Sequence, residues 1–328
     1  MAKANSKLSF KPRKHKRGVG EKEGFTPITV AMLVVLCVYV ISIFLLIFWT
    51  FITSVKHHLD FDQNILGFPQ SHLIRPDGTP GRKLGWQFSN YITVYKYFFV
   101  RKDIEIDGVV QKVEFGMPKM FWYAFLYASG CALTKALVPM LTAYTCAKFP
   151  YKFSKILHTI VIVTMILPIV GSLPSELRIA KRLGLYDEIW GLWIMRGNFL
   201  GMYFLVFYGN FKAMPMAYSE AAKIDGAGNF DVLIRIILPL VKNTFFTIFL
   251  LHFIAFWNDY NTPLIYMPSY PTIAYGLYEI TAKSTQNEMS EVPMKMAAAM
   301  QMLVPILVIF LLFHDKLLGN LTVGGIKG

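Results

Sequence analysis

The sequence predicts an all-helical polytopic membrane protein with six transmembrane helices, and three observations carry this prediction. Hydrophobic residues make up 55% of the 328 residues and charged residues only 16%, with a mean hydropathy of +0.45. A soluble domain usually carries about 25% charged residues. The apolar residues come in long blocks, and Ile28–Ile52 contains no charge. A helix needs about 20 apolar residues to cross a bilayer, and a spanning backbone must satisfy its own hydrogen bonds, which favours helices.

The first 27 residues are expected to be a basic cytoplasmic tail, followed by the first transmembrane helix at 28–52. Because the apolar block ends in bulky residues, it is interpreted as a retained anchor and not as a cleaved signal peptide. Much of the net charge of +13 lies in the tail, and positive charge before a span places that side in the cytoplasm. No recognition motif accompanies the charge, so we expect no nucleic-acid partner.

Five further spans are expected, at Met120–Ala147, Ile156–Leu173, Ile189–Phe211, Asn243–Tyr266 and Met294–Phe313. With an even number of spans, both termini of this multi-pass protein of the bacterial plasma membrane would be cytoplasmic. The chain then divides into the tail 1–27, the first span 28–52, an extracellular loop 53–118, a transmembrane core 119–315 that contains a cytoplasmic loop at 212–240, and a cytoplasmic tail 316–328. Alternating apolar residues in "IEIDGVVQKVEF" favour a small hairpin in the extracellular loop, and a loop that covers a partner protein is the alternative.

The cytoplasmic loop at 212–240 is the most mixed stretch of the chain, and it is expected to form a helix–turn–helix elbow. A short helix at Met216–Ile224 would end at "DGAG", where glycines are free to take positive φ. Asn229 can cap a second helix, and Pro239 would end or bend that helix. The elbow would be small on one side and apolar at its tip, a shape that suits docking onto another protein at the membrane face.

The spacing of residues in this loop resembles the EAA loop of ATP-binding-cassette (ABC) importer permeases. The pattern is Glu-Ala-Ala, three residues, Gly, nine residues, then Ile-x-Leu-Pro, and it is met by Glu220–Ala222, Gly226 and Ile236–Pro239. The longer stretch "EAAKIDGAGNF" is similar to the carbohydrate permeases of the maltose type, and the likeness runs over about 90–328. The residues that the resemblance assigns to ATPase coupling are Glu220, Ala221, Ala222, Asp225, Gly226, Ala227, Phe230 and Pro239.

The resemblance implies a permease subunit that imports sugars or oligosaccharides by alternating access, driven by partner ATPases. Its partners would be a second homologous permease in a heterodimer, two ABC ATPase subunits, an extracellular solute-binding protein and membrane lipid. The sequence has no Gly-x4-Gly-Lys-[Ser/Thr] motif, so ATP is not expected to bind here. No enzymatic activity, catalytic residue or cofactor is expected. The chain departs from the family in two ways: no proline follows "LPL" closely, and the first extracellular loop is long.

Polar residues within the expected spans are candidates for the substrate pathway. The candidates are Lys135, Arg196, Asn198, Trp257, Asn258 and Asp259. An ionisable group at membrane depth usually faces the bundle interior or water, and two basic groups would suit an acidic saccharide. The alternative is that both basic residues pair with the partner permease or reach a membrane edge. The segment "WNDY" has the aromatic and polar groups that sugars require, whereas a structural or gating role is its alternative.

Two other classes of function stay open at this level. An ion-coupled secondary transporter needs intramembrane carboxylates, and Asp259 is the one that we place in a span. A membrane-embedded enzyme needs a paired catalytic constellation, which the sequence does not offer. The three cysteines fall in apolar segments without the spacing of a metal site, so no metal is expected. His252 is expected near a membrane edge.

Overall fold

The computed structural model describes residues 26–74, 80–106, 109–149, 151–167, 171–282 and 288–321. Residues 1–25 of the predicted basic tail and 322–328 of the C-terminal tail therefore lie outside the described residues. The chain divides into two compact units, the first ending at Trp49 and the second starting at Thr50. Helix α1 (Pro27–Ser54) supplies the described helical residues of the first unit, where its apolar side chains are exposed.

The second unit begins with the small elements of the predicted extracellular loop. They are α2 (His58–Gln63), β1 (Gln70–Ile74), β2 (Pro80–Leu84), α3 (Ser89–Tyr97), β3 (Phe99–Ile106) and β4 (Val109–Gly116). The hairpin expected in "IEIDGVVQKVEF" is confirmed, since β3 and β4 pair antiparallel from Phe99 opposite Gly116 to Ile106 opposite Val109. A second antiparallel pair, β1 with β2, was not predicted.

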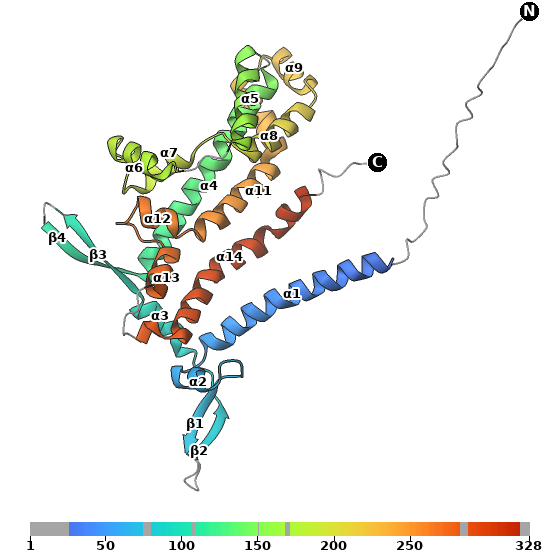
Figure 1. Ribbon diagram of the computed structural model, residues 1–328. Helices are drawn as coiled ribbons and strands as arrows, with labels where there is room; N and C mark the ends of the chain where they lie inside the picture. The colour runs from blue at the N-terminus through green and yellow to red at the C-terminus, as the bar shows by residue number, and fades with distance from the viewer. Residues whose placement is uncertain are drawn as a thin grey trace, which may run out of the picture. The chain divides into compact units, whose positions relative to one another are not determined.

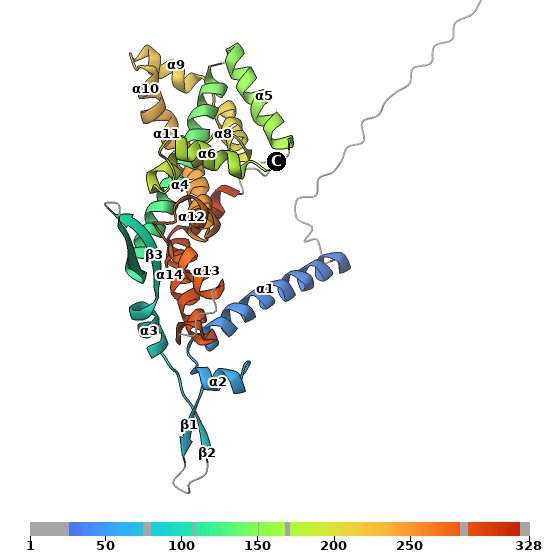
Figure 2. The same cartoon turned by 60° about the vertical axis from the view of Figure 1, so that its left-hand side comes forward.

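The rest of the second unit is helical and is built around one long helix, α4 (Met117–Lys148). The other helices are α5 (Lys152–Ile166), α6 (Leu173–Arg182), α7 (Ile189–Arg196), α8 (Met202–Ala213), α9 (Ala217–Ile224), α10 (Asn229–Asp231), a π-helix (Val232–Ile237), α11 (Leu238–Trp257), α12 (Asn261–Tyr266), α13 (Ile273–Ala282), a 3₁₀ turn (Glu288–Ser290) and α14 (Val292–Leu321). Helix α4 contacts α5, α7, α8, α11 and α13, and α11 also contacts α14. In both views α5 and α9 lie at one end of this unit and β1 and β2 at the other, with α3 and α13 between them (Figure 1 and Figure 2).

A stripe of alanines explains why α11 packs so closely on α4. Ala124, Ala128 and Ala132 are four residues apart, so they share one face of α4, and all three are buried. Small residues let neighbouring membrane helices approach each other. Phe253 and Trp257 of α11 belong to the same core cluster as this stripe, so the large side chains of one helix fill the space that the small ones leave.

Four helices in the described residues are long and apolar enough to cross a membrane: Pro27–Ser54, Met117–Lys148, Asn229–Trp257 and Val292–Phe313. They coincide with the first, second, fifth and sixth predicted spans. In the region of the third span, α5 ends at Ile166 and residues 168–170 lie outside the described part. The count of six spans therefore stays a prediction.

Two spans differ from single helices. The expected helix at 189–211 is wrong, because α7 and α8 are separated at 197–201, where Gly201 has φ +121°. Glycine adopts this conformation without steric cost, and it interrupts the helical path. The fifth span was also drawn too long, since α11 ends at Trp257 and a short break precedes α12.

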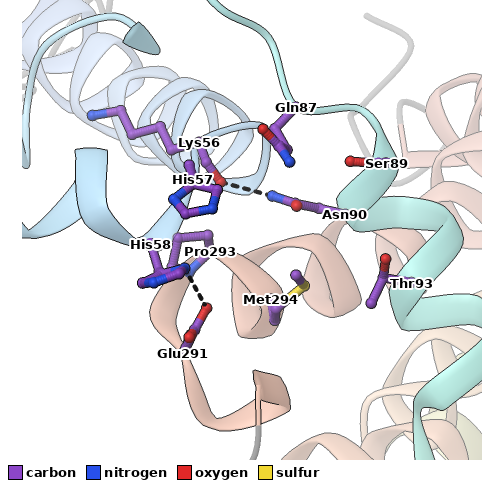
Figure 3. A pocket seen from close by; sticks show the side chains of 10 residues that line it. All are labelled: Lys56, His57, His58, Gln87, Ser89, Asn90, Thr93, Glu291, Pro293 and Met294. Carbon is purple, nitrogen blue, oxygen red and sulfur yellow. Dashed lines mark hydrogen bonds and ion pairs between the residues drawn. The ribbon is translucent and has the colours of Figure 1, made fainter. Parts of the chain in front are cut away.

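The segment that follows α1 is fastened to α3 by a buried amide. The Asn90 side chain donates hydrogen bonds to the backbone oxygens of Ser54 at 2.9 Å and Lys56 at 2.8 Å. Beside it, His58 Nδ1 lies 3.4 Å from Glu291 Oε2, which reaches over from the start of α14 (Figure 3). These side chains line a polar hollow of about 200 Å³. The junction thus depends on a few specific polar contacts.

Candidate functional site

The elbow predicted at 212–240 forms as two helical pieces joined by a tight turn. Helix α9 begins at Ala217, within one residue of the expected start, and ends at Ile224 as expected. Gly226 has φ +86°, and no atom lies within 4 Å of the position that a Cβ would occupy. The turn therefore requires glycine for its backbone conformation and not for lack of space.

The second half of the elbow corrects the expected cap and one of the two alternatives for Pro239, which were that it ends or bends the helix. Asn229 is the first residue of α10, Gly228 occupies the capping position, and no side-chain capping bond is made, so Asn229 is not the cap. Pro239 does not end the helix, because α10, the π-helix and α11 follow one another without a break up to Trp257. Proline lacks an N–H group and clashes with the carbonyl four residues earlier. The wider π turn directly before Pro239 accommodates both effects.

The elbow has a buried face and an exposed face. Ser219 and Ala222 are buried, and Ala222 packs in a cluster with Phe207 and Phe211 of α8. Lys148 Nζ, at the end of α4, donates to the backbone oxygen of Met214 at 2.8 Å, just before α9. These contacts hold the elbow against α8 and the end of α4.

The outward face carries most of the residues assigned to ATPase coupling. The exposed ones are Glu220, Ala221, Asp225, Gly226, Phe230 and Pro239, while Ala227 is half-buried and Ala222 is buried. Two large apolar side chains stand out, Ile224 at 87% and Phe230 at 71% exposure. A hollow of about 330 Å³ lies beside the turn, between Asp225 and Arg235. An apolar tip with an adjacent hollow is suited to insertion into a groove of another protein.

The substrate-pathway candidates divide into two groups. Lys135 of α4 donates to Asn198 Oδ1 at 3.0 Å, across from the break between α7 and α8. Arg196 Nη2 lies 3.5 Å from Thr262 Oγ1, and its guanidinium stands 5.4 Å from the centre of the Tyr266 ring. The structure therefore brings Lys135, Arg196 and Asn198 into one half-buried polar cluster.

The three candidates from "WNDY" make contacts with different parts of the structure. Asp259 lies beside the cluster, where its Oδ2 accepts from the Tyr127 hydroxyl at 3.0 Å and its Oδ1 from the Thr262 N–H at 3.1 Å. Trp257 is buried, and its Nε1 donates to the Met302 carbonyl on α14 at 3.3 Å. Asn258 is exposed and bonds within its own helix, to Ile254. Trp257 thus packs between helices, and Asn258 lies apart from the cluster.

His252 is a member of the cluster that sequence reasoning missed. It is half-buried on α11, with its ring 4.8 Å from that of Tyr203 and 6.1 Å from that of Phe256, and its place near a membrane edge stays a prediction. It lies within electrostatic range of the Lys135 ammonium. No sequence signal marked it, because its neighbours in the cluster come from α4 and from the segment between α7 and α8. Within the described ranges no group of three or more His, Cys, Asp or Glu could hold a metal ion.

Comparison with known proteins decides the family. Residues 135–320 match the family described as the binding-protein-dependent transport system inner membrane component. The chain belongs to this family. It is 28% identical over 212 residues to the maltodextrin transport system permease protein MdxG of Bacillus subtilis (strain 168), covering 63% of this chain and 75% of MdxG. The arabinooligosaccharides permease AraQ of the same organism is 26% identical over 192 residues, covering 57% of this chain and 66% of AraQ.

A solved structure shows the same fold. The crystal structure of a bacterial ABC transporter involved in the import of the acidic polysaccharide alginate aligns with a TM-score of 0.67 at 18% identity. The alignment covers 88% of this chain and 95% of that chain. This binding-protein-dependent permease is therefore a multi-pass membrane subunit of an ABC importer and not an enzyme. Its family works with ATPase subunits and a solute-binding protein, which disfavours the ion-coupled transporter and the membrane enzyme.

Proposed function

We propose that this permease imports sugars or oligosaccharides and forms a heterodimer with a second, homologous permease. The relatives named for maltodextrin and arabinooligosaccharides support the substrate class. The exposed apolar side chains of α1 suit contact with lipid. The basic tail supports cytoplasmic termini, and the loop 53–118 would then face the extracellular solute-binding protein.

The observation that supports the mechanism is that the elbow has an exposed apolar tip and is packed against the helices behind it. Ile224 and Phe230 are exposed, whereas Ala222 and Val232 beside them are buried in the helical body. Because α10 continues through the π-helix into α11, a push on the tip moves α11 as well. We infer that ATP-driven closure of the ATPases acts on this tip, and that α11 then tilts against α4 to give alternating access. The coupling residues Glu220–Pro239 act together as a lever.

The experiment that tests this mechanism is site-specific cross-linking in native membranes. A photoreactive phenylalanine analogue replaces Ile224, and in the control variant it replaces Leu66, which is 82% exposed in the loop 53–118. We expect the probe at 224 to cross-link to a subunit whose peptides contain an ATP-binding-cassette phosphate-binding loop, and the probe at 66 not to do so. ATPase adducts from position 66 and none from 224 would contradict the proposal.

A further inference from the structure

We propose that Lys135, Arg196 and His252 bind a carboxylate of the transported saccharide, so that this permease carries acidic oligosaccharides. This inference rests on the proposed function as a sugar permease, and it adds the charge of the cargo. It depends on how the three side chains are placed, on which of their donors are unused, and on what the neighbouring acids contact.

One face of α4 assembles the polar cluster. Tyr127, Cys131 and Lys135 are four residues apart, so they follow one another along a single face. The Tyr127 hydroxyl donates a hydrogen bond to Asp259, and the Lys135 ammonium donates one to Asn198. The charges of Lys135 and Arg196 act on each other, and that of Lys135 acts on His252 of α11. Two cations and an imidazole are thus held within electrostatic range at the middle of the longest helix of this unit.

The donors of this group are mostly unused. Among the described residues, the Arg196 Nε donor and the His252 Nε2 ring nitrogen, which donates when it carries the proton, are both buried and have no hydrogen-bond partner. The bond from Arg196 to Thr262 is long, at 3.5 Å, and Lys135 uses one of its three donors on the neutral amide of Asn198. Buried donors nearly always have partners, so the site is complete only when an acceptor enters it.

The neighbouring acids do not supply that acceptor. Asp259 receives hydrogen bonds from Tyr127 and the Thr262 backbone. Glu176 of α6, whose charge also acts on Arg196, receives them from Ser172 at 2.6 Å and Tyr266 at 2.9 Å. Both carboxylates are therefore held by neutral donors. No ion pair within 4.0 Å joins Lys135 or Arg196 to an acid in the part of the chain that the structure describes.

The carboxylate of a uronic acid would supply the acceptor that the donors of this cluster lack. A guanidinium presents paired N–H groups that fit a carboxylate in two parallel hydrogen bonds, and an ammonium beside it adds a second charge. Neutral hydroxyl groups can accept these bonds, but a carboxylate makes them charge-assisted and therefore about twice as strong. The competing account places an acid of the second permease against Lys135 and Arg196, and the experiment must separate the two.

The test is uptake by cells that express the complete transporter, using matched neutral and uronic-acid trisaccharides built on galactose, glucose and mannose. We expect Lys135→Gln and Arg196→Gln to reduce uptake of the acidic sugars by about tenfold or more, the loss expected when a buried charge pair is broken. Uptake of the neutral sugars should stay within about twofold. His252→Phe keeps an aromatic ring beside Tyr203 and should show the same selective loss. Lys155→Gln removes an exposed charge from α5 and is the matched control.

Each other outcome is decisive. Uptake of neutral but not acidic sugars by the unchanged protein would overturn this inference and leave the proposed sugar permease standing. Equal loss of both sugars, with poor co-purification of the second permease, would show that the cluster pairs with that subunit, and would overturn the inference as well. Uptake of neither sugar would overturn both proposals. Lys135→Arg, which keeps the charge, should retain acidic uptake.

Discussion

Replacing Gly226 by alanine should weaken the coupling of ATP hydrolysis to transport. Its φ of +86° is unfavourable for any residue with a Cβ, while the space around that Cβ is open. The cost is therefore confined to the backbone and amounts to about 1–2 kcal/mol. Such an energy changes the population of a conformation by a factor of about 5 to 30. We expect the turn to relax into other conformations. The population in which the tip with Ile224 keeps its present orientation should fall by that factor.

Gly184 provides a matched control, because the same strain would arise far from the elbow. It follows α6, has φ +67°, and also has no atom within 4 Å of its Cβ position. The assay is ATP hydrolysis by the reconstituted transporter, with and without its sugar-loaded solute-binding protein. Gly226→Ala should lower the stimulated rate about 5- to 30-fold, and Gly226→Val should lower it further. Gly184→Ala should leave it unchanged. Equal loss in both alanine variants, or normal stimulation of Gly226→Val, would refute the reasoning.

Three further predictions concern topology, stability and pH. In a cysteine-free background, cysteine at Ser71 should react with an impermeant thiol reagent in whole cells and cysteine at Asn229 should not; the reverse labelling would overturn the orientation. Asn90→Ala removes two buried hydrogen bonds and should lower the free energy of unfolding by about 2–4 kcal/mol, measured by thermal denaturation in detergent. Hydrogen bonds from Ser172 and Tyr266 lower the pKa of Glu176, so its contribution to stability is present above the usual glutamate pKa and lost as pH falls through the lowered value. The melting temperature of Glu176→Gln should therefore fall below that of the unchanged protein at pH 7, and the gap should close in acid; a gap that is equal at both pH values would contradict the assignment.

Sequence patterns predict an element where local chemistry decides it. The unbroken apolar block predicts α1, and the glycine two residues after Ile224 predicts both the end of α9 and the turn at Gly226. Mean hydropathy over a whole span cannot reveal the break at 197–201, because the two helices on either side, α7 and α8, are both largely apolar. The choice between an end and a bend at Pro239 stayed open for a related reason: the sequence shows that a proline disturbs a helix, but not that a π turn absorbs the disturbance.

The polar cluster shows the same limit at the level of side chains. A charge within an apolar stretch of the sequence is enough to single out Lys135 and Arg196. What each of them contacts depends on how α4 and α11 pack, and this information is absent from either helix alone. The role of His252 follows only from its place on the inner side of α11, and the hydrogen bonds of Asp259 follow only from its contact with Tyr127.

The π-helix at Val232–Ile237 sets the phase between the elbow and α11. Its two buried residues, Val232 and Ile237, are five positions apart, a spacing that matches one π turn and not one α turn. Each residue of an α-helix adds about 100° of rotation. Deleting a single residue here would restore ordinary pairing and swing the tip by about 100° around the axis of α11. The length of this short segment, to one residue, is therefore as strict a requirement for the direction of the tip as the chemistry of the residues on it.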